Sequence, residues 1–249
     1  MIKYGSSGWG AQVGVTAALL ARSGYTGDTE VFDGEYGFWR FTGRSEAQGK
    51  ETFADLGDKW LWRKINFKRY PSGGVLSGIL NQFIRLIEVN DIKAEDIVKI
   101  TAYAPPIVGF TLFSENELET PDDYCFNASY LLACAAHRMK LAYWQLKEIR
   151  RDEKIIKFMR SVDINVVTDK QPPGALEVVA KGKRYLGDAE SSRKPEPADG
   201  AAFDEMVIGK FRNNTFSHLS SEIREAIIQE ILNLENRTAI TCLMELVRK

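Results

Sequence analysis

The sequence predicts an α+β fold in which an α/β unit is inserted between two pieces of an all-helical one. Helix-forming runs lie near both ends of the chain, and several short strand-like runs lie between them. The 249 residues and 44% hydrophobic content are enough to bury a substantial core. We expect a partial helical domain over residues 1–58, an α+β lid-type domain over residues 59–200, and carboxyl-terminal helices over residues 201–249 that return to the helical domain.

The amino-terminal segment predicts one helix of about three turns. Alanine and leucine, which favour helices, dominate residues 11–22, and Gly24 follows where a helix would end. A single helix cannot enclose a core, so its apolar face needs later helices or another polypeptide.

The middle of the chain opens with a helix and a strand. Apolar residues recur at helical spacing over Val75–Val89, after a turn rich in proline and glycine. Residues 97–103 partly alternate and are closed by Pro105 and Pro106, which predicts a strand.

A long helix and further strands are expected next. Asn127 is a suitable cap for a helix over residues 127–150. Residues 162–168 and 175–180 flank a proline-glycine loop, which is typical of two joined strands, and residues 183–186 add a short one. The proline-containing stretch 190–200 then breaks regular structure. Three last helices are expected at residues 203–212, 221–234 and 238–247.

Composition argues against several function classes. Lysine plus arginine (33) balances aspartate plus glutamate (34), so no basic excess favours nucleic acid or an anionic membrane surface. No apolar run is long enough to span a membrane, and we expect a cytoplasmic protein. Cys125, Cys134 and Cys242 form no close pair, and His137 and His218 are the only histidines. We therefore expect neither a disulfide framework nor a metal site, and no cofactor.

The most informative stretch is Asn66–Gly74. Lys68 and Arg69 stand beside a turn containing Tyr70, Ser72 and Gly73, and this turn leads into the helix at Val75. Two cations beside backbone N–H groups at a helix start suit recognition of a carboxylate, and a partly desolvated lysine can transfer a proton. The alternative reading is that both cations are ordinary solvated surface.

Four motifs resemble, in order, those of one protein family. Lys68-Arg69-Tyr70-Pro71 is similar to a lysine-x-tyrosine-proline motif. Lys3, before the stretch Gly8–Ala21, resembles a lysine-containing approach to a glycine-alanine helix. Residues 126–130 resemble a segment ending in tyrosine, and residues 209–212 a lysine-phenylalanine signature. The family is MmgE/PrpD, which includes 2-methylcitrate dehydratase and cis-aconitate decarboxylase.

The resemblance implies a lyase or isomerase that moves a proton beside a carboxylate in dehydration, decarboxylation or epimerisation. It implies three catalytic residues, Lys3, Lys68 and Tyr130. Lys3 and Lys68 would bind carboxylate or oxyanion, and Tyr130 would donate a hydrogen bond or relay a proton. It also implies that substrate contacts come from Arg69, Tyr70, Ser72 and Gly73. Two departures matter: Ser6, and Gly73 with Ser77, stand where the family commonly has histidine.

The resemblance covers only the carboxyl-terminal half of the family's pattern, since nothing here corresponds to its long helical first half. We therefore expect a small carboxylate substrate and a second polypeptide supplying that half, with or without homo-oligomerisation. Two alternatives stay open: a noncatalytic scaffold or binding subunit of such a complex, and an enzyme repurposed for proton transfer on a less charged biosynthetic substrate.

Overall fold

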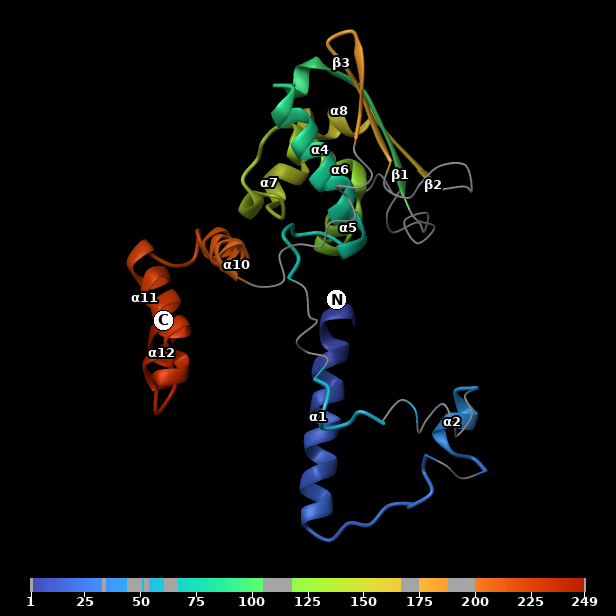
Figure 1. The fold of residues 1–249 in the computed structure, drawn as a ribbon, viewed down its shortest axis with the longest axis vertical. Coiled ribbons are helices and arrows are strands. Elements are labelled where there is room, and N and C mark those ends of the chain that lie inside the picture. Colours follow the sequence, from blue (N-terminus) through green and yellow to red (C-terminus); the bar gives the residue numbers. More distant parts are fainter. Residues whose placement is uncertain are drawn as a thin grey trace. The chain divides into compact units, whose positions relative to one another are not determined.

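The computed structural model describes residues 2–32, 35–43, 51, 54–60, 67–104, 118–166, 175–187 and 200–248 (Figure 1). The chain divides into two compact units, Met1–Ile65 and Asn66–Lys249. The division falls later than the expected boundary after residue 58, and residues 201–249 group with the second unit.

The first unit contains helix α1 (Ile2–Arg22) and the short helix α2 (Phe38–Phe41). α1 begins earlier than expected, because its early glycines lie inside the helix rather than before it. Its end matches the prediction: Gly24 has φ 89°, and the amide of Tyr25 donates to the carbonyl of Leu20. Glycine favours this left-handed closing turn because it has no Cβ.

The second unit contains a four-stranded mixed sheet in the order β2-β1-β3-β4. Strand β1 (Ile97–Ala104) is central and pairs parallel with β2 (Val162–Val166) and antiparallel with β3 (Leu176–Ala180). β4 (Lys183–Leu186) pairs antiparallel with β3. The described residues thus combine helices with a mixed sheet, which confirms the α+β class.

Both strands expected on either side of the proline-glycine loop are present, as β2 and β3. They are not neighbours in the sheet, because β1 lies between them. The parallel β1–β2 pair needs a crossover connection, and the helices after β1 occupy that part of the chain. The proline-glycine loop at residues 169–174 lies outside the described residues.

Helices cover one face of the sheet, as Figure 1 shows. Helix α4 (Ser77–Val89), entered through the 3₁₀ turn η2 (Gly74–Leu76), packs on α6 (Ala128–Ala136). Their apolar faces meet the inward side chains of β1 and β3, and the turn η3 (Ala94–Asp96) leads into β1. The opposite face is polar: Lys99 pairs with Asp163 at 2.6 Å.

Helix α6 ends much earlier than expected. Asn127 caps it as predicted, accepting from the amide of Tyr130 at 2.8 Å. However, Arg138 takes φ 51°, and the amides of Arg138 and Met139 close the helix end on the carbonyls of Ala135 and Cys134. The expected helix through Arg150 is therefore wrong beyond Ala136. A non-glycine residue in this closing position leaves no sequence signal.

Shorter elements flank α6. They are α5 (Pro121–Phe126) before it, and η6 (Leu141–Tyr143), α7 (Lys147–Arg150) and α8 (Glu153–Met159) after it. The four were not expected as separate elements.

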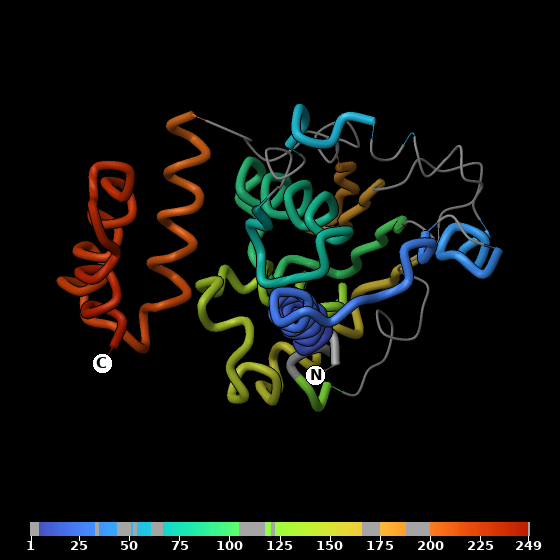
Figure 2. Tube along the Cα trace, turned by 90° about the horizontal axis from the view of Figure 1, so that it is seen from below, coloured from blue at the N-terminus to red at the C-terminus, as the bar shows by residue number. Residues whose placement is uncertain are grey.

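The chain then continues in the carboxyl-terminal helices. They are α10 (Gly200–Asn214), α11 (Ser221–Leu232), the turn η7 (Leu234–Asn236) and α12 (Thr241–Leu246). α11 and α12 lie side by side in Figures 1 and 2. Their positions follow the prediction closely. No helix in the described ranges is long and apolar enough to cross a membrane.

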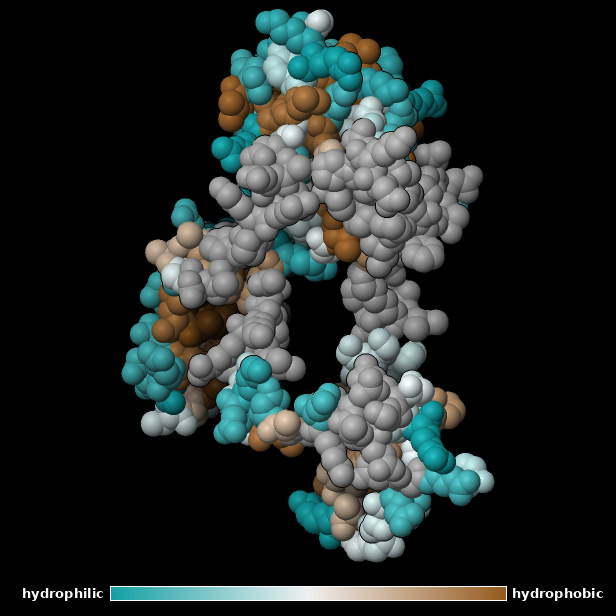
Figure 3. All heavy atoms as spheres, turned by 45° about the vertical axis from the view of Figure 1, so that its right-hand side comes forward, coloured by the Kyte–Doolittle hydropathy of each residue, from teal (hydrophilic) through white to brown (hydrophobic). Residues whose placement is uncertain are grey.

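Hydrophobic side chains remain exposed on the helices of both units. On α1, Trp9 is 59% and Val13 68% exposed. Figure 3 shows hydrophobic surface over the carboxyl-terminal helices, where Ile231, Leu232 and Met244 are half exposed. Within their own units, the described residues leave these helix faces exposed.

Candidate functional site

The backbone of the turn before α4 is held firmly in place. The amide of Ser72 donates to the carbonyl of Tyr70 at 2.8 Å, and the amide of Gly73 donates to the carbonyl of Cys125 at 2.7 Å. Ser72 is 3% exposed, and its hydroxyl donates to the carbonyl of Gly73 at 3.3 Å. Gly73 therefore anchors the turn to α5, and the amides of Ser72 and Gly73 and the hydroxyl of Ser72 are engaged within the protein.

Tyr70 belongs to the core. Its ring stacks on Trp144, with ring centroids 6.0 Å apart and planes 6° apart, and its hydroxyl donates to Oδ1 of Asn81 at 2.6 Å. The side chain is 4% exposed. In this arrangement Tyr70 fixes the turn onto α4 and the segment after η6, instead of facing solvent.

Lys68 and Lys210 meet at this turn. The ammonium of Lys68 donates to the carbonyl of Ser72 at 3.1 Å. The ammonium of Lys210, on α10, donates to the carbonyl of Lys68, from a position 142 residues further along the chain. Burial and then the positive charge of Lys68 lower the pKa of Lys210 below its ordinary value of 10.5. The ammonium groups of Lys68 and Lys210 thus both bond to carbonyls of one turn, and no ion pair with a carboxylate engages either among the described residues.

A hollow of about 560 Å³ lies beside Lys210. Arg69 and Lys210 line it together with Arg212 and with the acidic side chain Glu205. Arg212 is already paired with Glu225, at 2.6 Å. Arg69 and Lys210 are therefore the cations of this lining that form no ion pair among the described residues. Lys68 does not line the hollow but accepts from Lys210 at its carbonyl, and we call Lys68, Arg69 and Lys210 the basic turn site.

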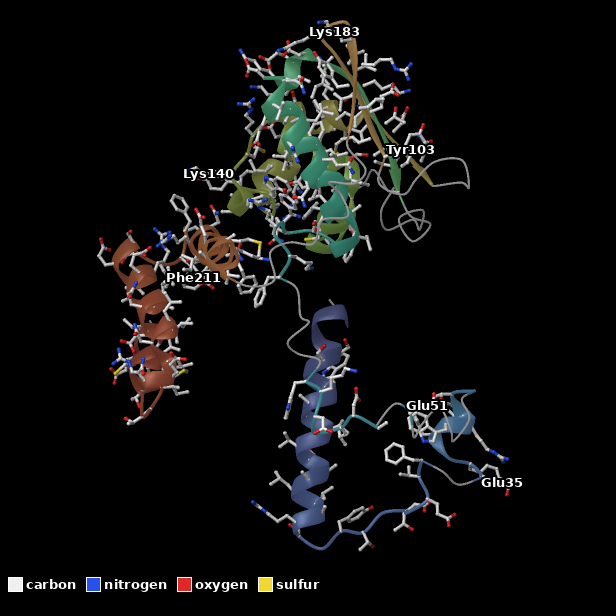
Figure 4. The ribbon with its side chains drawn as sticks, viewed as in Figure 1. Glu35, Glu51, Tyr103, Lys140, Lys183 and Phe211 are labelled. Carbon is white, nitrogen blue, oxygen red and sulfur yellow. The ribbon has the colours of Figure 1, made fainter. Side chains whose placement is uncertain are left out.

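Packing between α10 and the rest of the second unit holds the basic turn site together. The rings of Phe67 and Phe203 meet edge to face, with centroids 5.5 Å apart. Lys140 lies over the ring of Phe216, at 5.3 Å from the centroid. In Figure 4, Phe211 marks α10, and Lys183 marks the outer tip of the β3–β4 hairpin, distant from this site.

Tyr130 is not part of this surface. Its side chain is 0% exposed, and its hydroxyl donates to the carbonyl of Trp144 at 2.5 Å. Burial, and then the neighbouring Cys134 and Cys125, raise the pKa of Tyr130 far above 10.0. A hydroxyl so placed is a structural hydrogen-bond donor, so contact with substrate would require the segment around Trp144 to move.

Lys3 lies in the first turns of α1, in the first unit, and its side chain is outside the described residues. Its suggested role stays a prediction. Lys210, by contrast, was part of a recognised motif but was not expected at the site. Only the folding of α10 against the turn reveals it.

No cluster of three or more histidine, cysteine, aspartate or glutamate side chains with the geometry of a metal site exists in the described part of the chain. His137 is partly buried against Phe158, with ring centroids 5.6 Å apart, and the described chain offers no partner to its Nε2. Neither histidine lines the hollow beside the basic turn site.

The sequence matches no model of a known protein family. A search of curated proteins also finds no significant match. The likeness to the MmgE/PrpD family therefore rests on the four motifs and their order.

Proposed function

We propose that this chain is a subunit of an MmgE/PrpD-like lyase or isomerase, which binds a small carboxylate at the basic turn site and transfers a proton next to it. The observation that carries the proposal is the meeting of Lys68 and Lys210. Both ammonium groups bond to carbonyls of one turn, and two positive charges at one turn attract a negatively charged ligand.

The chemistry fits the charges. Removing a proton beside a carboxylate creates enolate-like charge, and preorganised cations stabilise that charge. Lys68 and Arg69 are suited to hold carboxylate groups. Lys210, with its lowered pKa, is the better candidate for accepting or returning the proton, because an amine is an effective base when its pKa approaches the working pH.

The other expected residues take different places in the proposal. Tyr70, Ser72 and Gly73 shape and fix the turn that presents Lys68, and Tyr130 supports it from behind through Trp144. The role of Lys3 is what the resemblance alone implies.

A second polypeptide is part of the proposal. Exposed hydrophobic side chains on α1 and on α11–α12 favour a protein partner, because such surfaces are normally covered. The partner would supply a helical region and the imidazole groups that the basic turn site lacks. Association of two copies of this chain is a further way to cover the same surfaces.

Deuterium exchange tests the activity directly. The chain, co-expressed with the products of neighbouring genes, is incubated in D₂O with citrate, malate and aspartate, and loss of the carbon-bound proton is followed by NMR. We expect exchange on one of these substrates or dehydration of it, strongly reduced in Lys210→Ala and Lys68→Ala. Lys183→Ala, an exposed lysine on β4, is the matched control and keeps the activity.

Equal turnover in the parent, Lys68→Ala and Lys210→Ala would contradict the catalytic proposal. That outcome would favour the second candidate, a noncatalytic scaffold or binding subunit. The full burial of the Tyr130 hydroxyl and the absence of histidine from the hollow's lining favour that alternative. The mass of the native assembly then shows whether a second polypeptide or a second copy of this chain covers the apolar surfaces. A scaffold also needs a partner, but it needs no intact basic turn site.

A further inference from the structure

A second cavity lies on the sheet side of the second unit. It has a volume of about 850 Å³ and shares no lining residue with the hollow beside the basic turn site. Strand β2, at one edge of the four-stranded sheet, forms one wall. Most of the other lining residues lie on or directly after α7 and α8, and Leu118 and Ser129 complete the lining.

Three arginines line this cavity: Arg150, Arg151 and Arg160. The acidic residue in the lining is Asp163, whose carboxylate is already paired with Lys99 at 2.6 Å. Within the described residues, no ion pair engages any of the three guanidinium groups. The cavity therefore carries an excess of positive charge.

Arg150 is held in a fixed position. Its guanidinium lies 4.0 Å from the centroid of the Tyr124 ring, and its Nη1 donates to the carbonyl of Glu119 at 3.0 Å. Its Nε is buried and has no hydrogen-bond partner in the described chain. The Tyr124 ring and the Glu119 carbonyl thus order the guanidinium, so little side-chain entropy is lost when an anion binds to it.

Apolar side chains line the rest of the cavity. Ile156 and Met159 come from α8, and Val162 and Ile164 from β2. A bare inorganic ion would leave this part of the wall uncovered, whereas an organic ligand would bury it. The lining thus combines a cationic end with an apolar wall.

We propose that this cavity binds a small organic anion, with a carboxylate or phosphate group held by the three arginines and an apolar body against α8 and β2. Planar guanidinium groups match both anions through paired N–H donors. The site is separate from the basic turn site, and its ligand is an additional one.

Calorimetric titration of the full chain tests the proposal. Phenyl phosphate and benzylsuccinate are the probes for the two anion types, inorganic phosphate is the head group alone, and benzyl alcohol is the apolar body alone. We expect saturable binding of one of the two organic anions, weaker binding of inorganic phosphate, and none of benzyl alcohol. Comparing the two organic anions decides between phosphate and carboxylate.

Variants locate the binding site. Arg151 and Arg160 are exposed, so glutamine at either position leaves the core intact, and each variant should weaken binding about ten-fold, which corresponds to about 1.4 kcal/mol. Arg85→Gln, an exposed arginine on α4, is the matched control and should bind as the parent does. Lys210→Gln should also bind normally, because Lys210 does not line this cavity.

Three results would overturn the proposal. One is the absence of saturable binding of both organic anions at millimolar concentration. Another is an equal loss in Arg85→Gln, which would mean unspecific attraction to charge. The third is a loss in Lys210→Gln with normal binding in Arg151→Gln and Arg160→Gln, which would place the anion at the basic turn site instead.

Discussion

The ammonium of Lys210 reaches the backbone carbonyl of Lys68 and thereby joins α10 to the turn before α4. The contact brings a second positive charge to the turn, and it does so from a helix near the other end of the chain. The local sequence around Lys68 gives no sign of it. The pairing makes the turn a site with two cations rather than a single exposed lysine.

Removing Lys68 should raise the pKa of Lys210. Burial and the charge of Lys68 both lower this pKa, and Lys68→Ala leaves only burial acting. Reductive methylation with ¹³C-formaldehyde, followed by NMR titration, measures the change, and Lys183→Ala is the control. Binding of a carboxylate should weaken as the pH rises through the lowered pKa, because Lys210 then loses its charge. An unchanged Lys210 titration in Lys68→Ala would contradict the proximity of the two ammonium groups.

Tyr130→Phe should destabilise the protein by about 1–3 kcal/mol, because the Trp144 carbonyl then loses its buried donor. Urea unfolding measures the change. Tyr143→Phe is the control, since Tyr143 is only partly buried and should change stability little. If Tyr130→Phe kept full stability but abolished proton exchange in the assembly, the hydroxyl would serve the chemistry and the segment around Trp144 would have to open.

How far the sequence could predict this fold depends on how local each signal is. The helix at residues 75–89 and the strand at residues 97–103 follow from spacing within the segment itself, and both predictions are confirmed. The end of α6 at Ala136 could not be predicted, because Arg138 adopts a left-handed conformation without being glycine. The order of strands in the sheet could not be predicted from local sequence either, because the whole chain decides which strands pair.

The same contrast applies to the site. The residue types beside the turn indicated an anion site, and the structure shows Arg69 in the lining of a hollow with Lys210, whereas Lys68 does not line it. Tyr70 and Tyr130 carry motif positions, yet both are core residues whose hydroxyls bond within the protein. Burial of a tyrosine cannot be read from its motif, since the same side chain serves packing and chemistry alike.

Acid should destabilise the protein through His137. Burial lowers the pKa of His137 below 6.5, Lys154 lowers it further, and Asp152 and Glu95 oppose the shift by smaller amounts. The unfolded chain therefore binds a proton more readily than the folded one. The contribution of His137 to stability is fully present above pH 6.5 and is lost as the pH drops from there toward the lowered pKa of the folded state.

His137→Leu should remove this part of the pH dependence between pH 7 and 5, measured by urea unfolding. His218→Leu, at an exposed position, is the control, and an equal change in both variants would contradict the assignment.

Gly187→Ala should destabilise the protein, although the backbone conformation at residue 187 is open to any residue. A Cβ there would lie 2.9 Å from the Cβ of Leu176 and 2.5 Å from Oε1 of Gln82. The Leu176 Cβ is attached to the backbone of β3 and cannot swing away, so the strand end must shift, at about 1–3 kcal/mol. Gly209 is the matched control: a Cβ there meets nothing within 4 Å, so Gly209→Ala on α10 should stabilise the helix by about 0.5–1 kcal/mol. Thermal unfolding of both variants gives the comparison. The two substitutions should change the free energy of unfolding in opposite directions, because residue 187 is crowded and residue 209 faces open space. Equal stability of the two variants would mean that residue 187 does not pack against β3.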